Sequence, residues 1–374
     1  MHEVKPHGGS LVNLLLDEDA AEALKEESGG FASITLSQRQ LCDLELLLNG
    51  AFSPLTGFMT RAQYDPVVES MSLPDGILWP LPIVLDVPQA FAEKLTGGDR
   101  VALRDNEGFM PAVLEVEDIW TPDRQHEAAR VYGTTDTAHP GVRYLLDDVK
   151  PVYIGGRVLG VQAPLHHDFE NLWDSPEEMR GLFRKLGWRR VVAFQTSKPM
   201  HRLQRDITLR VAKELQAHIL LHPTVGMTKP GDVHYYARVH CYQAMRRHFP
   251  HNLAMLSLLP LAMRMAGPRE ALWHAIVHQN YGCSHMIVGP KHAGPPAAPA
   301  PDDRADPGGG GGRPRCLRRA RQAQAAGEGF RGAHGGHFRQ RRLGDLHDHH
   351  RRHPRPARPP LRSRAHADGG AYAG

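Results

Sequence analysis

The sequence predicts an α/β protein in three parts: a β-rich, barrel-like domain over residues 1–165, a strand–helix domain over 166–296, and a disordered tail over 297–374. Short alternating apolar runs separated by Gly and Asn indicate strands in the first part. From Trp188 onward, strand-like segments alternate with helix-like ones. Near Pro295 the composition changes abruptly to Ala, Arg, Gly, Pro and His.

The first domain is expected to contain several strands and two short helices. Apolar or alternating runs predict strands at 78–87, 100–104 and 112–116. Helices are predicted at 18–27 and 37–48, the second with Ser37 as its N-cap, because serine accepts a hydrogen bond from the first turn. The domain shows no nucleophile–base pair and no metal-ligand spacing. We therefore expect it to support a catalytic domain.

The second domain is expected to form a parallel sheet covered by helices. Strands are predicted at 190–194, 218–221, 253–259 and 286–289. A helix should follow the first strand from about Pro199, because Leu203, Ile207, Val211 and Leu215 are spaced by four. Two further helices are predicted, at 232–248 and 267–280. Such alternation produces βαβ units, which bind ligands at the carboxyl ends of their strands.

The tail lacks the side chains that build a core. Residues 297–374 contain 16 Arg, no Lys and 7 Asp or Glu, and no Ile, Val, Met or Trp. One interpretation is an Arg-rich arm that binds nucleic acid through its phosphates. The other, which we favour, is out-of-frame translation of a GC-rich gene, because the change falls next to a motif and not in a linker. Residues 1–296 are mildly acidic, with 29 Lys plus Arg against 34 Asp plus Glu.

Composition and cysteine usage exclude several classes of protein. The hydrophobic fraction of 41% and the charged fraction of 23% are typical of globular proteins. The longest apolar stretch, 253–263, is too short to cross a bilayer, and the N-terminus lacks a secretory signal pattern. We therefore expect a cytoplasmic protein with no membrane partner. The cysteines form no C-x-x-C pair, which predicts buried free thiols at Cys42, Cys241, Cys283 and Cys316.

The first chemistry-bearing segment, QTSKPMHRLQ at 195–204, lies between a predicted strand and the helix after it. A helix N-terminus presents unpaired N–H groups and a positive dipole end, which suit a phosphate. Pro199 fits the first helical position, where a missing N–H costs nothing. His201 would then lie in the first turn and could donate a hydrogen bond to a phosphoryl oxygen. Gln204 would project from the same face one turn later.

The second segment, VGPKHAG at 288–294, follows the last predicted strand. Together the two segments resemble the sulfate adenylyltransferase (ATP sulfurylase) family, which carries Gln-Thr-Arg-Asn-Pro-x-His-x-x-His in the first turn and Gly-Arg-Asp-His-Ala-Gly in the second. The first motif is matched at Gln195, Thr196, Pro199 and His201, and the second at Gly289, His292, Ala293 and Gly294. Segments 41–60, 131–142, 226–233 and 255–276 are also similar to the family.

The chain departs from these motifs at five positions. Ser197 replaces the arginine that contacts sulfate in the family, Lys198 replaces the asparagine, and Gln204 replaces the second histidine. Pro290 and Lys291 replace the Arg–Asp pair of the second motif. A serine cannot replace a bidentate guanidinium on an oxyanion, although a lysine supplies a point charge.

The resemblance implies a PUA-like N-terminal domain, a Rossmann-like doubly wound nucleotidyltransferase domain and a defined reaction. ATP and sulfate would give adenylyl sulfate and diphosphate, by in-line attack of sulfate on the α-phosphorus. It implies catalytic roles for Thr196, Ser197, Lys198, His201 and Gln204. It implies ATP or sulfate binding by Gln195, Thr196, Ser197, Gly289, Pro290, Lys291, His292 and Ala293. Mg²⁺ would arrive with ATP, with no protein-held metal and no tightly bound cofactor, and the chain would form a homodimer.

Two alternatives stay open at this stage. The altered motif residues could make the chain a catalytically impaired homologue, or the basic tail could make it a nucleic-acid-binding protein, although we do not expect nucleic acid as a partner. Other polar residues are interpreted as structural: His222, His274, His278 and His285. Lys229 and Asp232 lie in a Pro-Gly turn with a structural or a substrate-contacting role, and Arg264 and Arg269 flank a helix start where phosphate contact is a secondary hypothesis.

Overall fold

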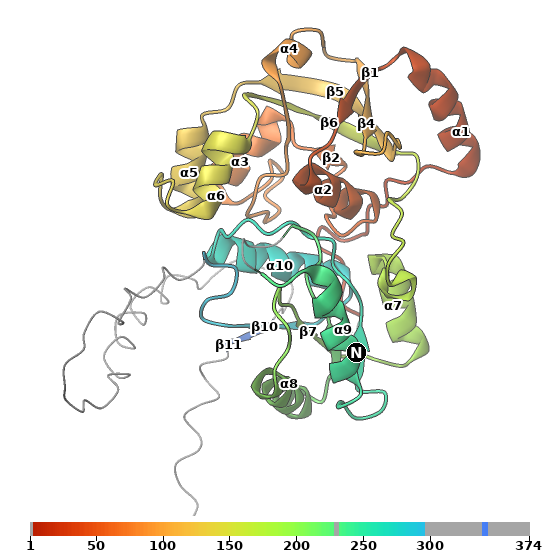
Figure 1. The fold of residues 1–374 in the computed structure, drawn as a ribbon, viewed down its shortest axis with the longest axis vertical. Coiled ribbons are helices and arrows are strands. Elements are labelled where there is room, and N and C mark those ends of the chain that lie inside the picture. Colours follow the sequence, from red (N-terminus) through yellow and green to blue (C-terminus); the bar gives the residue numbers. More distant parts are fainter. Residues whose placement is uncertain (1–2, 228–231, 296–338, 343–374) are drawn as a thin grey trace, which may run out of the picture.

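The computed structural model describes residues 3–227 and 232–295, together with the backbone of a short strand at 339–342. Two sheets, each with its own helices, form two halves of the molecule (Figure 1). The N-terminal half carries the helices α1–α6, and the second half carries α7–α10. Helix α10, Pro268–Asn280, lies where the two halves meet (Figure 1).

The N-terminal sheet has the strand order β1-β4-β5-β6-β2, with β3 also paired to β6. Its strands β1 and β4 are parallel, and the other pairs are antiparallel. The strands are β1 Ala32–Thr35, β2 Gly57–Phe58, β3 Leu85–Val87, β4 Arg100–Arg104, β5 Ala112–Trp120 and β6 Val152–Gly160. The helices are α1 Glu18–Glu27, α2 Gln38–Leu48, α3 Arg61–Ser70, α4 Gln89–Ala92, α5 Arg124–Tyr132 and α6 Pro140–Arg143, with 3-10 turn Ser28–Gly30 and π-helical turn Tyr144–Asp148.

Two helices and two strands of this half lie where they were predicted, whereas α3–α6, β1, β2 and β6 were not predicted. Helix α1 has the predicted limits, and α2 starts after Ser37, whose N–H donates to Gln40 Oε1 at 2.8 Å. Strands β4 and β5 also lie where they were predicted. The predicted strand at 78–87 is wrong for most of its length, since only Leu85–Val87 is a strand. Pro80 and Pro82 lack the N–H groups that a sheet requires.

The second sheet is parallel and has the order β11-β10-β7-β8-β9. Its strands are β7 Val191–Phe194, β8 His218–Leu221, β9 Ala254–Leu256, β10 His285–Val288 and β11 Arg339–Arg342. The helices are α7 Pro176–Lys185, α8 Arg202–Leu215, α9 Tyr235–Arg246 and α10, and a 3-10 turn covers Glu170–Leu172. The order runs outward from β7 through β8 to β9, and then restarts on the other side of β7 with β10. The strand order therefore reverses between β7 and β10, as in doubly wound sheets.

Helix α10 is the main structural link between the two halves. Nine of its 13 residues are buried, because one face packs on the second sheet and the other on the N-terminal half. Phe52 of the N-terminal half contacts Trp273 of α10 with ring centroids 5.1 Å apart. At the helix end, Asn280 Nδ2 donates to the carbonyls of Ala51 and Ser53 at 2.9 and 3.0 Å.

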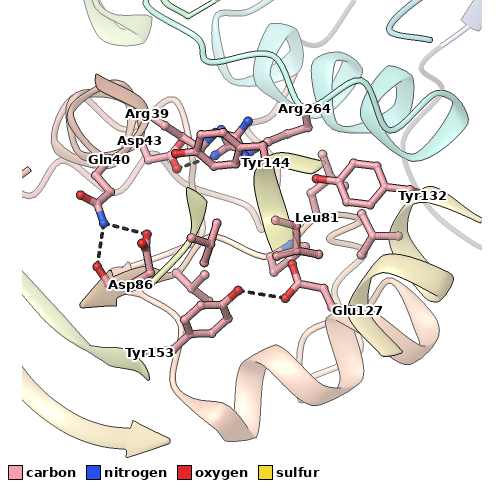
Figure 2. A pocket seen from close by; sticks show the side chains of 15 residues that line it. Arg39, Gln40, Asp43, Leu81, Asp86, Glu127, Tyr132, Tyr144, Tyr153 and Arg264 are labelled. Atoms are coloured by element: carbon pink, nitrogen blue, oxygen red, sulfur yellow. Dashed lines mark hydrogen bonds and ion pairs between the residues drawn. The ribbon is translucent and has the colours of Figure 1, made fainter. Parts of the chain in front are cut away.

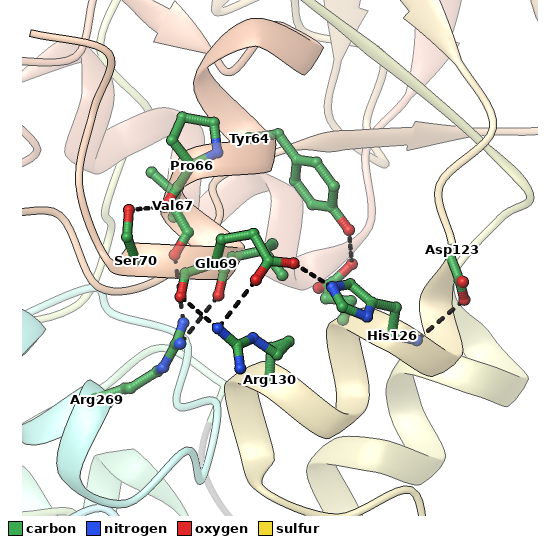
Figure 3. Close-up of polar contacts among 11 residues, drawn as sticks. Tyr64, Pro66, Val67, Glu69, Ser70, Asp123, His126, Arg130 and Arg269 are labelled. Atoms are coloured by element: carbon green, nitrogen blue, oxygen red, sulfur yellow. Dashed lines mark hydrogen bonds and ion pairs between the residues drawn. The ribbon is translucent and has the colours of Figure 1, made fainter.

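Two arginines, Arg264 before α10 and Arg269 in its first turn, complete this interface. Arg269 donates to the carbonyls of Val67 and Val68 near the C-terminal end of α3, next to the cluster in which Glu69 pairs with His126 and Arg130 (Figure 3). Arg264 pairs with Asp43 of α2 in a buried contact. Both guanidinium groups therefore hold the domains together through these contacts.

Several other expectations have clear outcomes. Cys42 and Cys283 are buried free thiols, but Cys241 is exposed on α9. Cys316, Lys229 and the predicted disordered tail lie outside the described residues, except that 339–342 forms β11 beside β10. Among the described residues, no helix is long and apolar enough to span a membrane.

Candidate active site

The first loop, residues 195–201, follows the carboxyl end of β7 and is held by hydrogen bonds from α9 and from the segment after β8. Gln195 Nε2 donates to Thr224 Oγ1, in the segment after β8, at 2.9 Å. Arg238 of α9 donates from Nη1 to the carbonyl oxygens of Ser197 and Thr224 at 2.9 and 2.7 Å. Tyr242, one turn later on α9, donates its hydroxyl proton to the carbonyl of Lys198 at 2.6 Å. The path of this loop is therefore fixed mainly through its backbone carbonyls.

Arg238 combines deep burial with incomplete hydrogen bonding. The residue is 1% exposed, and its Nε atom has no hydrogen-bond partner in the described part of the chain. Burial lowers its pKa, an effect opposed by Asp232 and Tyr242, yet a guanidinium stays charged at any physiological pH. A fixed positive charge thus lies directly against residue 197.

The side chains of the first loop divide into buried and exposed ones. Gln195 and Ser197 are 6% and 8% exposed, and the Oε1 atom of Gln195 has no hydrogen-bond partner among the described residues. Thr196 is half-buried and accepts a hydrogen bond from the Lys198 N–H at 3.0 Å. Lys198 and His201 are exposed. The two basic side chains of the loop, Lys198 and His201, are therefore exposed to solvent, whereas Gln195 and Ser197 are buried.

Helix α8 begins three residues later than predicted. His201 is its N-cap and Arg202 its first residue, so Pro199 and His201 precede the helix. Gln204 causes this start, because its Oε1 accepts the His201 N–H at 3.1 Å in a capping-box arrangement. The amide of Gln204 thus folds back onto the helix end and does not project beside His201.

The second loop, residues 289–294, leaves the carboxyl end of β10 in a tight turn. The His292 N–H donates to the Gly289 carbonyl at 3.0 Å, and Ala293 adopts a left-handed backbone conformation with φ of 55°. The Gly267 N–H, at the start of α10, donates to the Ala293 carbonyl at 3.0 Å. Pro290 and Lys291 are exposed, Gly289 is half-buried and Ala293 is buried. The imidazole of His292 contacts His274 of α10, with 2.9 Å between Nε2 and Nδ1.

The topology brings the two loops to one place. Strands β7 and β10 are parallel neighbours, with His285 opposite Val192 and Met286 opposite Ala193, so their carboxyl ends share one edge of the sheet. The strand order reverses between these two strands, which is where doubly wound sheets bind their ligands. Basic side chains from both loops, Lys198, His201 and Lys291, stand at this edge. Such a site can bind two anions and stabilise charge that develops between them.

Two cavities lie elsewhere in the molecule. One, of about 50 Å³, lies between the domains and is lined by Arg39, Asp43, Glu127, Tyr132, Tyr144 and Arg264, among others (Figure 2). The Arg39 guanidinium stacks on the Tyr144 ring 3.5 Å from its centroid. The other, of about 410 Å³, lies between the N-terminal segment and α7. None of the predicted site residues lines either cavity. The described residues also hold no group of three His, Cys, Asp or Glu side chains that could bind a metal ion.

Reasoning from the sequence missed the residues that support the two loops. These are Thr224, Arg238 and Tyr242 for the first loop, and Glu270 and His274 for the second. Arg238 and Tyr242 are spaced by four on a predicted helix, which marks one face but not what that face contacts. The motif residues themselves could be found because they are contiguous in the chain.

Comparisons with known proteins identify two domain families in this chain. The PUA-like domain family matches residues 4–163, and the ATP-sulfurylase family matches residues 170–305. A sulfate adenylyltransferase from Gibberella zeae is 50% identical over 294 residues, which cover 78% of this chain and 51% of that protein. One from Eremothecium gossypii is 46% identical over 301 residues, 80% of this chain and 60% of the relative.

A solved structure is also similar. It is described as a hexameric APS kinase from Thiobacillus denitrificans, with a TM-score of 0.66 and 39% identity over 76% of this chain and 52% of that one. The predicted fold class, a PUA-like domain followed by a doubly wound α/β domain, is confirmed. The chain spans about half the length of the curated relatives it matches.

Proposed function

This chain belongs to the sulfate adenylyltransferase (ATP-sulfurylase) family over residues 4–305, and we propose that it converts ATP and sulfate to adenylyl sulfate and diphosphate. One observation carries the proposal. Both segments that match the family motifs leave adjacent parallel strands at the point where the strand order reverses. A site for two anionic substrates requires such a pair of loops facing one space.

In the proposed reaction, an oxygen of sulfate attacks the α-phosphorus of ATP and diphosphate leaves on the opposite side. A P–O bond to sulfate forms as the P–O bond to diphosphate breaks, so no covalent enzyme intermediate is needed. The task of the protein is to bring two repelling anions together and to stabilise the charge on the phosphorus. Mg²⁺ enters as the MgATP substrate, in which the phosphates supply most of its ligands.

We assign the roles from the placement of each residue. His201 is exposed at the N-terminal end of α8, where the helix dipole also favours an anion, so it is the best donor to a phosphoryl oxygen. Lys198 supplies an exposed charge for sulfate, and the backbone of Thr196 and Ser197 lines the pocket. Gln195 has a buried Oε1 with no hydrogen-bond partner in the part of the chain that the structure describes, and this atom can accept a hydrogen bond from a substrate group.

The second loop is assigned to the nucleotide. Gly289, Pro290, Lys291, His292 and Ala293 would close over ATP, with Lys291 contributing an exposed positive charge. Gln204 contributes through the helix start, because its amide caps His201. We also propose domain limits near residues 165 and 296, a cytoplasmic location and a homodimer, as the family resemblance implies. The described residues provide no observation in favour of nucleic acid binding.

The experiment measures ATP formed from adenylyl sulfate and diphosphate by the purified full chain. We expect activity that falls by roughly 10²–10³-fold in His201→Ala, because one preorganised donor to the reacting phosphate is removed. His248→Ala is the matched control, since His248 is exposed near the end of α9 and far along the chain from both loops. Wild-type activity no higher than that of His201→Ala would refute the proposal.

A further inference from the structure

A chain of three buried or half-buried side chains leads from α10 to the second loop. His274 is 1% exposed and Glu270 is fully buried, and both lie on α10 one turn apart. His274 Nδ1 is 2.9 Å from His292 Nε2, and His274 Nε2 is 3.3 Å from Glu270 Oε1. The proposed catalytic loops do not contain Glu270 or His274. Through these two residues, α10 nevertheless contacts His292 of the second loop.

Glu270 is held as a carboxylate by several donors. Its Oε1 accepts the Arg264 N–H at 2.9 Å, and its Oε2 accepts the Ala266 N–H at 2.8 Å. Burial acts to raise the pKa of Glu270, but His274 and the two backbone N–H groups lower it below its ordinary value. An ionised carboxylate therefore faces His274 Nε2 at ion-pair distance, although the pair is not aligned as a hydrogen bond.

The other groups around His274 do not supply a competing charge. His278, one turn further along α10, contacts the His274 carbonyl through Nδ1, and burial lowers its pKa to about 3, so it is neutral. The Arg264 guanidinium is paired with Asp43. The ring of Trp273, which carries no charge, lies beside His274 with the ring centroids 5.7 Å apart. Glu270 is therefore the charge that decides which nitrogen of His274 carries the proton.

The proton order along the chain follows from these contacts. A carboxylate next to Nε2 favours a proton on that atom, which leaves Nδ1 of a neutral His274 as an acceptor. An acceptor at Nδ1 requires His292 to donate, so the proton of a neutral His292 is on its Nε2. The contact with His274 then sets which nitrogen of a neutral His292 carries the proton.

We propose that Glu270 and His274 are positioning residues that fix the tautomer and orientation of His292. The same carboxylate holds the backbone at Arg264 and Ala266, and the Gly267 N–H holds Ala293, so the segment before α10 and the second loop form one unit. The consequence for substrate binding rests on the proposed function. The tautomer itself can be tested without any activity. A carboxylate that orients a histidine through its far nitrogen is a known device where the histidine must present one defined atom.

The test uses two substitutions of His274, each of which keeps one of its two contacts, with His292 or with Glu270. In His274→Asn, the amide oxygen replaces Nδ1 and can still accept from His292. In His274→Gln, the longer amide replaces Nε2 and keeps the contact with Glu270, but loses His292. Nitrogen-15 NMR of histidine-labelled full-length protein at pH 8, assigned by a His292→Gln spectrum, reports the tautomer of His292. We expect the Nε2–H tautomer in the wild type and in His274→Asn, and a mixture of both tautomers in His274→Gln.

The two variants should also differ in their KM for adenylyl sulfate. The KM for adenylyl sulfate should rise about tenfold in His274→Gln and stay within about threefold in His274→Asn. An Nδ1–H tautomer of His292 in the wild type would overturn the proposal, as would identical His292 signals in wild type and His274→Gln. If the KM rose equally in both variants and both lost the same thermal stability, His274 would have a merely structural role, which would overturn the proposal. An inactive wild type with the expected tautomers would refute the proposed reaction, but it would support the role of Glu270 and His274 in positioning His292.

Discussion

The two loops at the switch point are fixed in different ways. The first loop is held mainly by its main chain, because Arg238 and Tyr242 bind the carbonyls of Ser197 and Lys198, with one side-chain contact from Gln195 to Thr224. The second loop is held in part through a side chain that is itself a motif residue, since His292 contacts His274. A loop held by its carbonyls can change side chains without moving. A loop held through His292 cannot change that residue without losing its position.

This difference agrees with where the motif departures fall. Of the five departures from the family motifs, Ser197, Lys198, Pro290 and Lys291 take no part through their side chains in the loop contacts described above, whereas the Gln204 side chain caps His201. His292, whose side chain contacts His274, matches the family. Four of the five departures therefore change the charge at the two loops and leave the described loop contacts in place, and the fifth, Gln204, sets the start of α8.

Among changes outside the motif histidines, the largest effect is expected from removing the support of the first loop. Arg238→Met takes the donor from the carbonyls of Ser197 and Thr224, which would shift the loop and lower kcat/KM by about 10²-fold. We expect a loss of about 1–2 kcal/mol in the free energy of unfolding, because two buried acceptors lose their partner while a desolvated charge is also removed. Kinetics and urea unfolding measure the two quantities.

Arg246→Met is the control for this variant, since Arg246 is exposed near the end of the same helix. It should change neither quantity measurably. If Arg238→Met were as active as Arg246→Met, the first loop would not depend on its carbonyl contacts, and the contrast between the two loops would fail.

The sequence predicted most strands and helices of the second domain because local signals determine them, but it missed α7 there and β1, β2, β6 and α3–α6 in the first domain. The cap at Ser37, the spacing of apolar residues from Leu203 to Leu215, and Gly267-Pro268 before α10 each appear within a few residues. Motif residues were found for the same reason. The supports were missed because they join distant positions: Arg238 to Ser197, and His274 to His292. A single sequence gives the face of a helix but not its neighbour.

The start of α8 shows how a local prediction can fail for a physical reason. Pro199 suits a first helical position, yet the Gln204 amide competes by capping His201 two residues later. The same limit applies to Arg264 and Arg269. Their place beside a predicted site suggested phosphate, whereas the structure pairs them with Asp43 and with carbonyls near the end of α3.

A buried carboxylate outside the loops provides a contrasting case. Glu127, at the cavity between the domains (Figure 2), accepts hydrogen bonds from the hydroxyls of Tyr64 and Tyr153 at 2.8 and 3.1 Å. Burial, opposed by these two donors, raises its pKa from 4.5 to about 6. The folded state therefore binds the proton more tightly than the unfolded state, and stability falls as the pH rises from about 4.5 through 6.

Glu127→Gln should remove this pH dependence, because its amide oxygen can accept both tyrosine hydroxyls without carrying a charge. The free energy of unfolding of Glu127→Gln relative to wild type should increase by about 2 kcal/mol between pH 4.5 and pH 7.5, with no change in kcat. Urea unfolding at both pH values measures it. A difference that is the same at both pH values would mean that Glu127 titrates normally, and lost activity would connect this cavity to the loops.

The smallest effect is expected from restoring one motif residue, and it tests whether the first loop tolerates a new side chain. In Gln204→His the cap on the His201 N–H is lost, which should cost about 0.5–1 kcal/mol of stability. The imidazole gains a donor that can carry charge next to His201, which should raise kcat about tenfold. Gln204→Ala loses the same cap without gaining a donor, so it should show the stability cost alone. If the two variants were equally slow, the cap would matter more than the charge, and the first loop would depend on its side chains as the second does.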